Sequence, residues 1–416
     1  MPRLRRYLLA VTVACTLSYI LITWIRFWEA PVKKKLNGAD TGRFMASDIV
    51  FQSLSNKPYV PRERTDRDED SKRRFPDGKM RKSLVKAQNF PDQDALGSNN
   101  STVTNLGNLV KMSQQKYLIY VCDSVRSCGG WGDRQRGLVS TFVLANVTNR
   151  TFGIVMTKPC NLTTFYVPNE VNWVIPPRDL VNKSSVRIDD MDSRSQITGK
   201  LSKIDFNSNY SADVVYIRTN GEFILGLKRN KLYANKLPAW SSKSLSETFR
   251  RGWRIMMKPS EHLQEHLDNF MTSIPRPLVC AHVRMGRSST IKMDSEVRGN
   301  ISDLPVLWEF LDRYVKNGSH IFLATDSNEV RNLTRARFQT RLHDTGGRIM
   351  HVDKQAFLPR ACEGFESALL DQLILTKCDV LVTSKSIFSQ RAAYLRGSSE
   401  NLFRFVSGKI SKIQIG

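Results

Sequence analysis

In the last third of the chain, short apolar runs alternate with longer segments whose apolar residues recur every three or four positions. The apolar runs predict strands and the periodic segments predict helices. Strands are expected at 278–285 (LVCAHVRM), 320–326, 348–353 (RIMHVD), 379–384 and 402–406. Helices are expected between them at 304–315, 328–338, 365–378 and 387–397. Such alternation is typical of a doubly wound α/β domain with a parallel sheet.

A second unit of the same kind precedes it. KYLIYVC (116–122) and TFGIVMT (151–157) are predicted strands, and the helical spacing of Leu138, Phe142 and Ala145 lies between them. This is the βαβ pattern of a parallel sheet. A strand is expected at 213–220 and a helix at 244–256, but the rest of 158–270 has a weak pattern. The chain is therefore predicted to contain two α/β domains, at 116–270 and 271–416.

The first 115 residues do not have the alternating pattern of strands and helices that the two α/β units show. Residues 7–25 (YLLAVTVACTLSYILITWI) carry no charge, and at ~1.5 Å per residue a helix of this length spans a bilayer core. Arginines precede the run and no small-residue cleavage site follows it, which predicts an uncleaved transmembrane anchor after a cytosolic tail, residues 1–6. Residues 26–115 are polar and charged without an apolar period, which predicts a flexible stem.

Sequons and cysteines favour a lumenal location for the globular part. The Asn-x-Ser/Thr pattern occurs only after the predicted anchor, as expected for a type II chain in the secretory pathway. It begins at Asn99, Asn100, Asn146, Asn149, Asn161, Asn182, Asn209, Asn300, Asn317 and Asn332. Six of the seven cysteines follow the anchor, and an even number permits disulfides in an oxidising compartment. Cys122 and Cys128 are close enough to close a short loop, although the sequence leaves the pairing open.

The chain is strongly basic, with a formal net charge of +24. Such a charge is compatible with nucleic acid, an anionic membrane surface or an anionic substrate. A lumenal protein meets no nucleic acid, so an anionic substrate is the favoured partner of the globular part.

Candidate binding residues lie where predicted strands end, and ligands of doubly wound sheets bind beyond the carboxyl ends of the strands. His282 and Arg284 lie near the carboxyl end of the strand at 278–285, and Gly286 and Arg287 follow it. Arginine suits a phosphate because its planar guanidinium donates two parallel hydrogen bonds. A surface ion pair is the alternative for Arg284, and a hydrogen-bonded core histidine is the alternative for His282.

Two further strand ends complete the pattern. Asp326 ends the strand at 320–326, and its carboxylate suits a sugar or base hydroxyl. Ser386 and Ser389 begin the helix after the strand at 379–384, where hydroxyl and backbone N–H groups suit a phosphate. Ser327 and Ser389 are equally suited to cap helices. Together these segments predict a pocket for a nucleotide diphosphate.

The glycine-rich segment CGGWGDRQRG (128–137) is a further candidate. Gly130 and its neighbours let the backbone approach a ligand closely, and Asp133 and Arg134 then lie at a helix start beside the cleft. A purely structural turn is the alternative. DDMD (189–192) resembles an acidic metal motif, but no predicted strand precedes it, so a solvated loop is favoured and no metal site is predicted.

Three segments of the second half together resemble the three peptide motifs of the fucosyltransferase superfamily, which joins α1,2-, α1,6- and protein O-fucosyltransferases. The segments are AHVRMG (281–286), FLATDS (322–327) and LLDQLILTKCDVLVTSKSIFSQRAAYL (369–395). CGGWGDRQRGLVSTFVLANVTNRTFGI (128–154) is similar to its N-terminal glycine-rich segment. The resemblance implies a GT-B-like fold, in which two Rossmann-like domains face a cleft. In this fold 116–270 forms the acceptor side and 271–416 the nucleotide-sugar side.

The resemblance also implies an activity. It predicts inverting, metal-independent transfer of fucose from GDP-fucose to a glycan or glycoprotein, by a type II protein of the Golgi membrane. Arg284 would hold the diphosphate, His282 and Asp326 would contact the nucleotide, and Ser389 and Gln390 would approach it. Transfer needs a base for the acceptor proton, and the candidates are Asp133, Asp294 and Glu296. The alternatives are a transferase of another nucleotide sugar and an inactive glycan-binding relative.

Overall fold

The computed structural model describes residues 115–416, apart from 124–125, 192–196 and 242. The predicted tail and anchor, and the stem up to residue 114, lie outside these residues. Within the described part, no helix combines the length and the apolar character that a membrane span requires.

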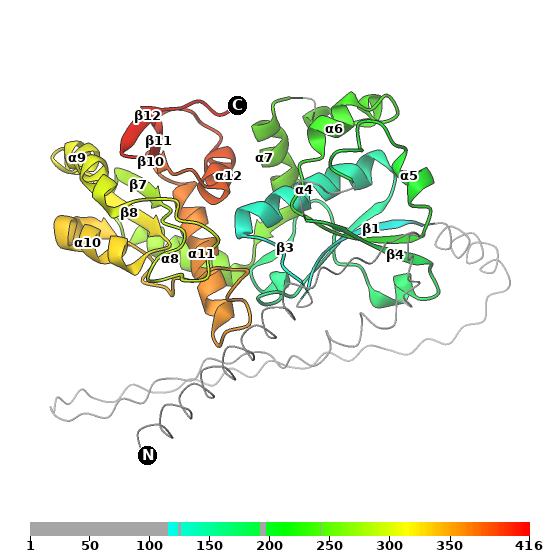
Figure 1. Cartoon of the computed structure of the whole chain (residues 1–416), viewed down its shortest axis with the longest axis horizontal. Helices are drawn as coiled ribbons and strands as arrows, with labels where there is room; N and C mark the ends of the chain where they lie inside the picture. The colour runs from blue at the N-terminus through cyan, green and yellow to red at the C-terminus, as the bar shows by residue number, and fades with distance from the viewer. Residues whose placement is uncertain (1–114, 124–125, 192–196, 242) are drawn as a thin grey trace, which may run out of the picture. The chain divides into compact units, whose positions relative to one another are not determined.

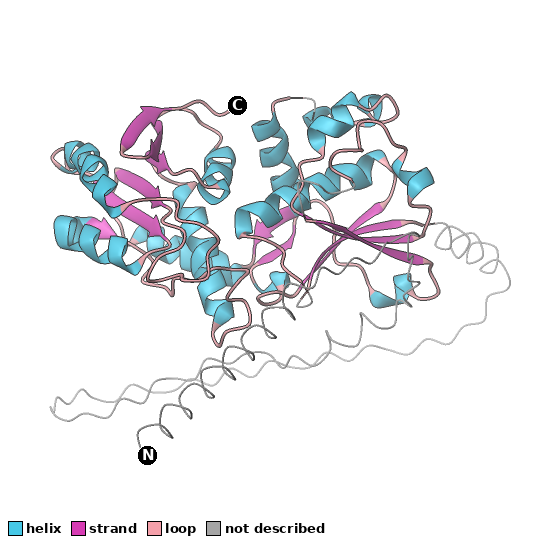
Figure 2. Ribbon diagram, in the orientation of Figure 1, coloured by secondary structure: helices cyan, strands magenta, loops and turns pink. Residues whose placement is uncertain are grey.

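The first sheet has four strands in the order β2-β1-β5-β4, all parallel. Their bounds are β1 Tyr117–Cys122, β2 Thr151–Met156, β4 Ser185–Asp190 and β5 Val214–Thr219. The helices of this half are α4 Trp131–Val147, α5 Phe206–Asn209, α6 Ile224–Arg229 and α7 Leu245–Met256, and β3 Tyr166–Pro168 pairs with β6 Met257–Pro259. Figures 1 and 2 show helices packed beside this sheet.

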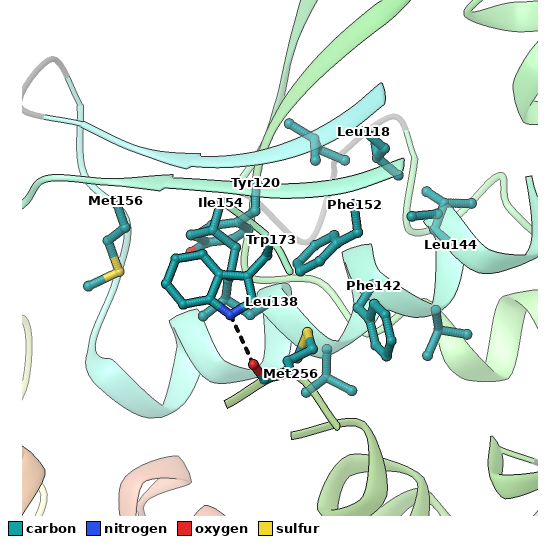
Figure 3. Packing of buried hydrophobic residues seen from close by; sticks show 14 of the residues in the cluster. Leu118, Tyr120, Leu138, Phe142, Leu144, Phe152, Ile154, Met156, Trp173 and Met256 are labelled. Carbon is teal, nitrogen blue, oxygen red and sulfur yellow. Dashed lines mark hydrogen bonds between the residues drawn. The ribbon is translucent and has the colours of Figure 1, made fainter. Parts of the chain in front are cut away.

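Helix α4 is buried on nearly all sides, because it lies between the first sheet and other helices. Leu138 and Phe142, whose spacing predicted the helix, pack into the core that β1 and β2 share with Trp173 (Figure 3). The indole N–H of Trp173 donates to the backbone oxygen of Met256 at 2.9 Å, which satisfies the polar group of a fully buried ring.

The second sheet has six strands in the order β12-β11-β10-β7-β8-β9, and only β12 is antiparallel to its neighbour. The strands are β7 Leu278–Val283, β8 His320–Thr325, β9 Leu342–His343, β10 Val380–Thr383, β11 Leu402–Val406 and β12 Lys409–Lys412. The helices are α8 Glu261–Thr272, α9 Leu304–Val315, α10 Asn328–Phe338, α11 Ala361–Leu375 and α12 Ile387–Arg396. The predicted α/β fold with parallel sheets is therefore confirmed.

Helix α8 contains the predicted domain boundary at 270 and contributes to both cores. Leu263 packs with the first sheet's core, whereas Leu267 packs with the second sheet's core. Phe365 of α11 also packs into the first core, where its ring lies against Trp131. The two sheets are thus joined by shared apolar packing.

Two predicted elements are wrong. RIMHVD (348–353) is a loop rather than a strand, and β9, the edge strand at Leu342–His343, comes before it. The apolar residues of this segment do not pack as strand residues do. Met350 packs against Gly364 of α11, and Val352 belongs to the first core.

DDMD is not a solvated loop, because Asp189 and Asp190 are the last residues of β4. Asp190 is buried and accepts hydrogen bonds from the backbone of Ile197 at 3.0 Å and the hydroxyl of Thr198 at 2.8 Å. Asp192 lies outside the described residues. Both Asp189 and Asp190 are therefore part of the first sheet.

The six cysteines after the predicted anchor form three disulfides, Cys122–Cys128, Cys160–Cys362 and Cys280–Cys378. The first closes the short loop that the sequence suggested. The second joins the loop after β2 to the start of α11, and the third joins β7 to the turn between α11 and β10. The predicted presence of disulfides is confirmed.

Candidate nucleotide-sugar site

A cavity of about 640 Å³ lies beyond the carboxyl ends of β7, β8 and β10. The starts of α4 and α12, one face of α11 and the loop before α11 complete its wall. Its volume falls in the range of small-molecule sites, ~300–1,000 Å³. Seven cationic side chains line it, Arg284, Arg298, Arg331, Arg348, Lys354, Lys385 and Arg404, against five carboxylates, Asp133, Asp294, Asp326, Asp353 and Asp371.

The cavity lies at the point where the strand order reverses. From β7 the chain moves first to β8 on one side and later to β10 on the other, and ligands of open α/β sheets bind at such a switch point. His282 of β7 and Ser384 after β10 meet there, with Nδ1 of the imidazole 2.7 Å from the hydroxyl oxygen. Burial and the nearby Arg284 lower the pKa of His282 to about 3, so the ring is neutral. His282 is thus both a hydrogen-bonded buried histidine and a residue of the cavity wall.

Arg284, the first residue after β7, is fixed between two carboxylates. Its Nη1 donates to Asp326 Oδ2 at 2.7 Å, and its Nη2 donates to Asp294 Oδ2. A guanidinium has five N–H donors, so the two ion pairs leave donors for a ligand. The side chain is 20% exposed and lines the cavity, which makes it different from a surface ion pair.

Asp326 orients Arg284 and the turn after it. Besides the guanidinium, its carboxylate accepts from the backbone N–H groups of Met285 at 2.7 Å and Gly286 at 2.8 Å. Burial raises the pKa of Asp326, while Arg284 and these N–H groups act in the opposite direction. Both oxygens are engaged in these hydrogen bonds, so Asp326 holds Arg284 and the turn after β7 in place at the cavity wall.

The three candidate bases are in different environments. Asp133 lines the cavity and pairs with Arg136 at 3.1 Å. Asp294 also lines it, and although burial opposes ionisation, Arg284 and the N–H of Ser295 hold the pKa of its carboxyl below the usual value. Glu296 is 62% exposed, pairs with Arg298 at 2.6 Å, and is not among the described residues that line the cavity.

Two helices begin at the cavity, and the residues before them, Gly130 for α4 and Ser386 for α12, make no side-chain cap hydrogen bond. The first backbone N–H groups of a helix and its dipole favour an anion. Gly132 allows the two helix starts to meet, because a Cβ there would lie 2.8 Å from the backbone of Ile387 and Phe388. Gln390 of α12 lines the cavity and donates to the Tyr394 hydroxyl at 3.1 Å.

Four other predicted ligand contacts lie outside the cavity lining. Arg134 is fully buried and donates to the backbone oxygens of Gly129 and Lys158, so it braces the glycine-rich segment. Ser389 is buried, with its hydroxyl near Ser384 and Ser386 of the α12 start. Arg287 is exposed outside the cavity. Gly286 has a positive φ of +72°, and the backbone oxygen of Glu296 occupies the position that a Cβ would take, so this position requires glycine. None of these four is among the described residues that line the cavity.

The sequence interpretation missed the residues supplied by the loop 344–360. Arg348, His351, Asp353 and Lys354 line the cavity from this loop. Asp353 also accepts from the Ser127 hydroxyl at 2.5 Å and the Cys128 N–H at 2.8 Å, so it ties the loop to the disulfide-closed segment. The adjacent glycines Gly346 and Gly347, typical of a turn, were a signal that a loop begins there.

Fold and cavity together define an α/β protein with two largely parallel sheets and a cationic cavity at the switch point of the second sheet. Among solved structures, a mutant of Arabidopsis thaliana FUT1 in complex with GDP matches this chain with a TM-score of 0.50 and 12% identity, over 73% of this chain and 75% of that chain. The chain therefore has the fold of that FUT1 structure, and the expected fold is confirmed at this level.

Two other structures are similar at lower scores. NodZ α-1,6-fucosyltransferase soaked with GDP-fucose has a TM-score of 0.46 and 16% identity over 72% of this chain and 99% of that chain, and NodZ is a Bradyrhizobium protein. POFUT1 in complex with GDP has a TM-score of 0.39 and 12% identity over 70% of this chain and 99% of that chain. No known family model matches the sequence, and no curated protein matches it.

Proposed function

We propose that the protein is a member of the fucosyltransferase superfamily that transfers fucose from GDP-fucose to a glycan or glycoprotein. The observation that carries this proposal is Arg284, held by Asp294 and Asp326 at the carboxyl end of β7, where it faces a cationic cavity. The shared fold with FUT1, whose structure contains GDP, supports a guanosine nucleotide as the donor's leaving group.

The arrangement supports a single displacement with inversion. The acceptor hydroxyl oxygen forms a bond to the anomeric carbon while the bond from that carbon to the diphosphate breaks, and the electron pair leaves with GDP. Arg284, Lys385 and the N-termini of α4 and α12 stabilise the charge that develops on the diphosphate. Asp133 takes the acceptor proton in this proposal, because the ion pair with Arg284 lowers the pKa of Asp294 and makes it a weaker base, and because Glu296 is outside the cavity. The reaction uses no metal ion.

We further propose a type II protein of the Golgi membrane with its catalytic part in the lumen. The uncharged segment 7–25 supports an anchor, and three disulfides support an oxidising compartment. Sequon asparagines within the described residues are all exposed and thus accessible to glycosylation. They are Asn146, Asn149, Asn161, Asn182, Asn209, Asn300, Asn317 and Asn332.

Nucleotide binding tests the donor assignment. GDP is expected to raise the melting temperature of the purified protein at low ionic strength, because anion binding to cationic side chains is weakened by salt. UDP should stabilise it less at equal concentration. Equal stabilisation by both nucleotides would reject guanosine as the base that the site recognises.

A further inference from the structure

Helices α8 and α11 bring two imidazoles and a carboxylate together outside the cavity. His262 and His266 are separated by four residues and lie on the same face of α8. Glu366 of α11 places its Oε1 2.8 Å from His262 Nε2 and 2.8 Å from His266 Nδ1. The three potential ligand atoms all lie within 4.8 Å of one another.

We propose that His262, His266 and Glu366 form a binding site for a divalent transition metal ion of the zinc class. Zn–N and Zn–O bonds of ~2.0–2.2 Å in a tetrahedron place ligand atoms ~3.4 Å apart. The two distances from Glu366 are 2.8 Å, shorter than this value, and all three ligand atoms lie within 4.8 Å of one another, so modest side-chain movements would create the coordination geometry. Two nitrogen ligands favour zinc over magnesium or calcium, which prefer oxygen.

Exposure fits a site that is loaded from solution. The side chains of His262 and His266 are 50% and 46% exposed, whereas that of Glu366 is 22% exposed. The fourth coordination position therefore faces solvent and takes a water molecule. Glu366, the least exposed of the three side chains, provides the more fixed ligand.

The position of the site points to a structural role. At ~100° per residue, Glu366 lies roughly 100–160° around α11 from Gly364, Ser367 and Asp371, which line the cavity, so it faces away from the cavity wall. A metal ion would link α8 to α11 beside the Cys160–Cys362 disulfide and so stabilise one wall of the cavity. This inference is independent of the proposed transfer reaction.

Metal binding by the full-length protein tests the proposal. The protein is treated with EDTA, desalted and titrated with zinc chloride by calorimetry, with its melting temperature recorded with and without zinc. One saturable ion per chain and a melting temperature raised by several degrees are expected. Glu366→Gln and the double variant His262→Ala/His266→Ala should each weaken binding at least tenfold.

The matched control is Glu265→Gln, which removes an exposed carboxylate of α8 between the two histidines and should bind zinc as the wild type does. The other histidine pair, His320 and His343, is 2.8 Å apart and provides a competing explanation. Absence of saturable binding, or binding that survives Glu366→Gln but is lost in His343→Ala, would overturn the proposal. If the double variant fails to fold, the conservative Glu366→Gln variant alone decides.

Discussion

At the scale of the residue, Arg284 is the centre of the site. Its guanidinium is held by Asp294 and Asp326, and Asp326 is itself held by the N–H groups of Met285 and Gly286. This chain of hydrogen bonds orients the remaining donors toward the cavity before any ligand arrives. Preorganised donors of this kind account for much of enzymatic charge stabilisation.

Replacing Arg284 with lysine should therefore reduce turnover. Lysine keeps the charge but loses the planar fork, and loss of one preorganised contact raises the barrier by about 3 kcal/mol, which is roughly a hundredfold in rate. The measurement is turnover of Arg284→Lys at saturating donor, beside its melting temperature.

Arg287→Lys is the matched control, because Arg287 is exposed outside the cavity, and its turnover should equal that of the wild type. Wild-type turnover of a folded Arg284→Lys protein would contradict the role assigned to Arg284.

Asp371 gives a prediction about pH. It lines the cavity from α11, and burial raises the pKa of its carboxyl to about 7, although the Thr345 hydroxyl at 2.8 Å acts in the opposite direction. The folded state thus keeps a proton that the unfolded state releases above its pKa of 3.8. The stability contributed by this group is present at low pH and is lost as pH rises through about 7.

Asp371→Asn removes this pH-dependent loss of stability, because an amide does not ionise in this range. Its side-chain oxygen can still accept the hydrogen bond from the Thr345 hydroxyl. Its melting temperature relative to wild type should increase between about pH 4 and pH 7, by a few degrees. Thermal melts of both proteins across this pH range measure the difference. The control is Asp312→Asn, which changes a half-buried carboxylate of α9 away from the cavity. A constant difference at all pH values would show that Asp371 is ionised in the folded protein.

Individual residues were predictable where a strand delivers them. His282, Arg284 and Asp326 were identified because the carboxyl ends of parallel strands meet at one edge of a sheet. Arg298, Arg331, Arg348 and Arg404 reach the cavity from loops, a helix and a neighbouring strand, and no local pattern distinguishes them from surface arginines. Arg134 was misassigned because a buried arginine that binds backbone oxygens has the same sequence context as a ligand-binding one.

At the scale of the element, helix α4 explains much of the glycine-rich segment. Gly132 permits contact with the start of α12, and Gly137 permits contact with β5, because a Cβ on Gly137 would lie 2.0 Å from the Thr219 carbonyl oxygen. These glycines were first attributed to a loop that approaches a ligand. Their spacing instead serves the packing of a buried helix against a strand and a second helix.

Gly137→Ala should destabilise the protein even though alanine favours helices by ~1 kcal/mol. The added methyl group forces α4 away from β5, and overpacking of this kind costs about 1–3 kcal/mol or more. Denaturant unfolding measures the change. Gly199→Ala, where a Cβ meets no atom within 4 Å, is the control and should be near neutral. Equal stability of both variants would contradict the packing argument.

Elements were predicted well where their apolar period is strong. The strands β7, β8 and β10 and the helices α9 and α10 lie where the pattern placed them. The strand β4 (SVRIDD) was missed because its outward residues are polar and two charged residues end it. The spacing His262-x-x-x-His266 was also passed over, since its partner Glu366 lies on another helix, which only the tertiary structure brings near.

At the scale of the whole molecule, one experiment with EDTA tests the proposed reaction and the proposed metal site independently of each other. Transfer by the protein is expected to continue in EDTA, because the cationic side chains and helix N-termini at the cavity stabilise the leaving diphosphate. The assay compares turnover before and after EDTA, with zinc or manganese added back. Loss of turnover that manganese restores would contradict the metal-independent mechanism, whereas a lower melting temperature with unchanged turnover agrees with a structural zinc site.

The central claim is that the cavity binds GDP-fucose and that the protein transfers its fucose. The most direct measurement is release of GDP or UDP from a panel of GDP- and UDP-sugars, each incubated with the protein and a set of glycan and glycoprotein acceptors. Acceptor-dependent release of GDP from GDP-fucose, exceeding release from every other donor and reduced about a hundredfold in Arg284→Lys, is the predicted result. Preference for another nucleotide sugar, or glycan binding without release from any donor, would contradict it.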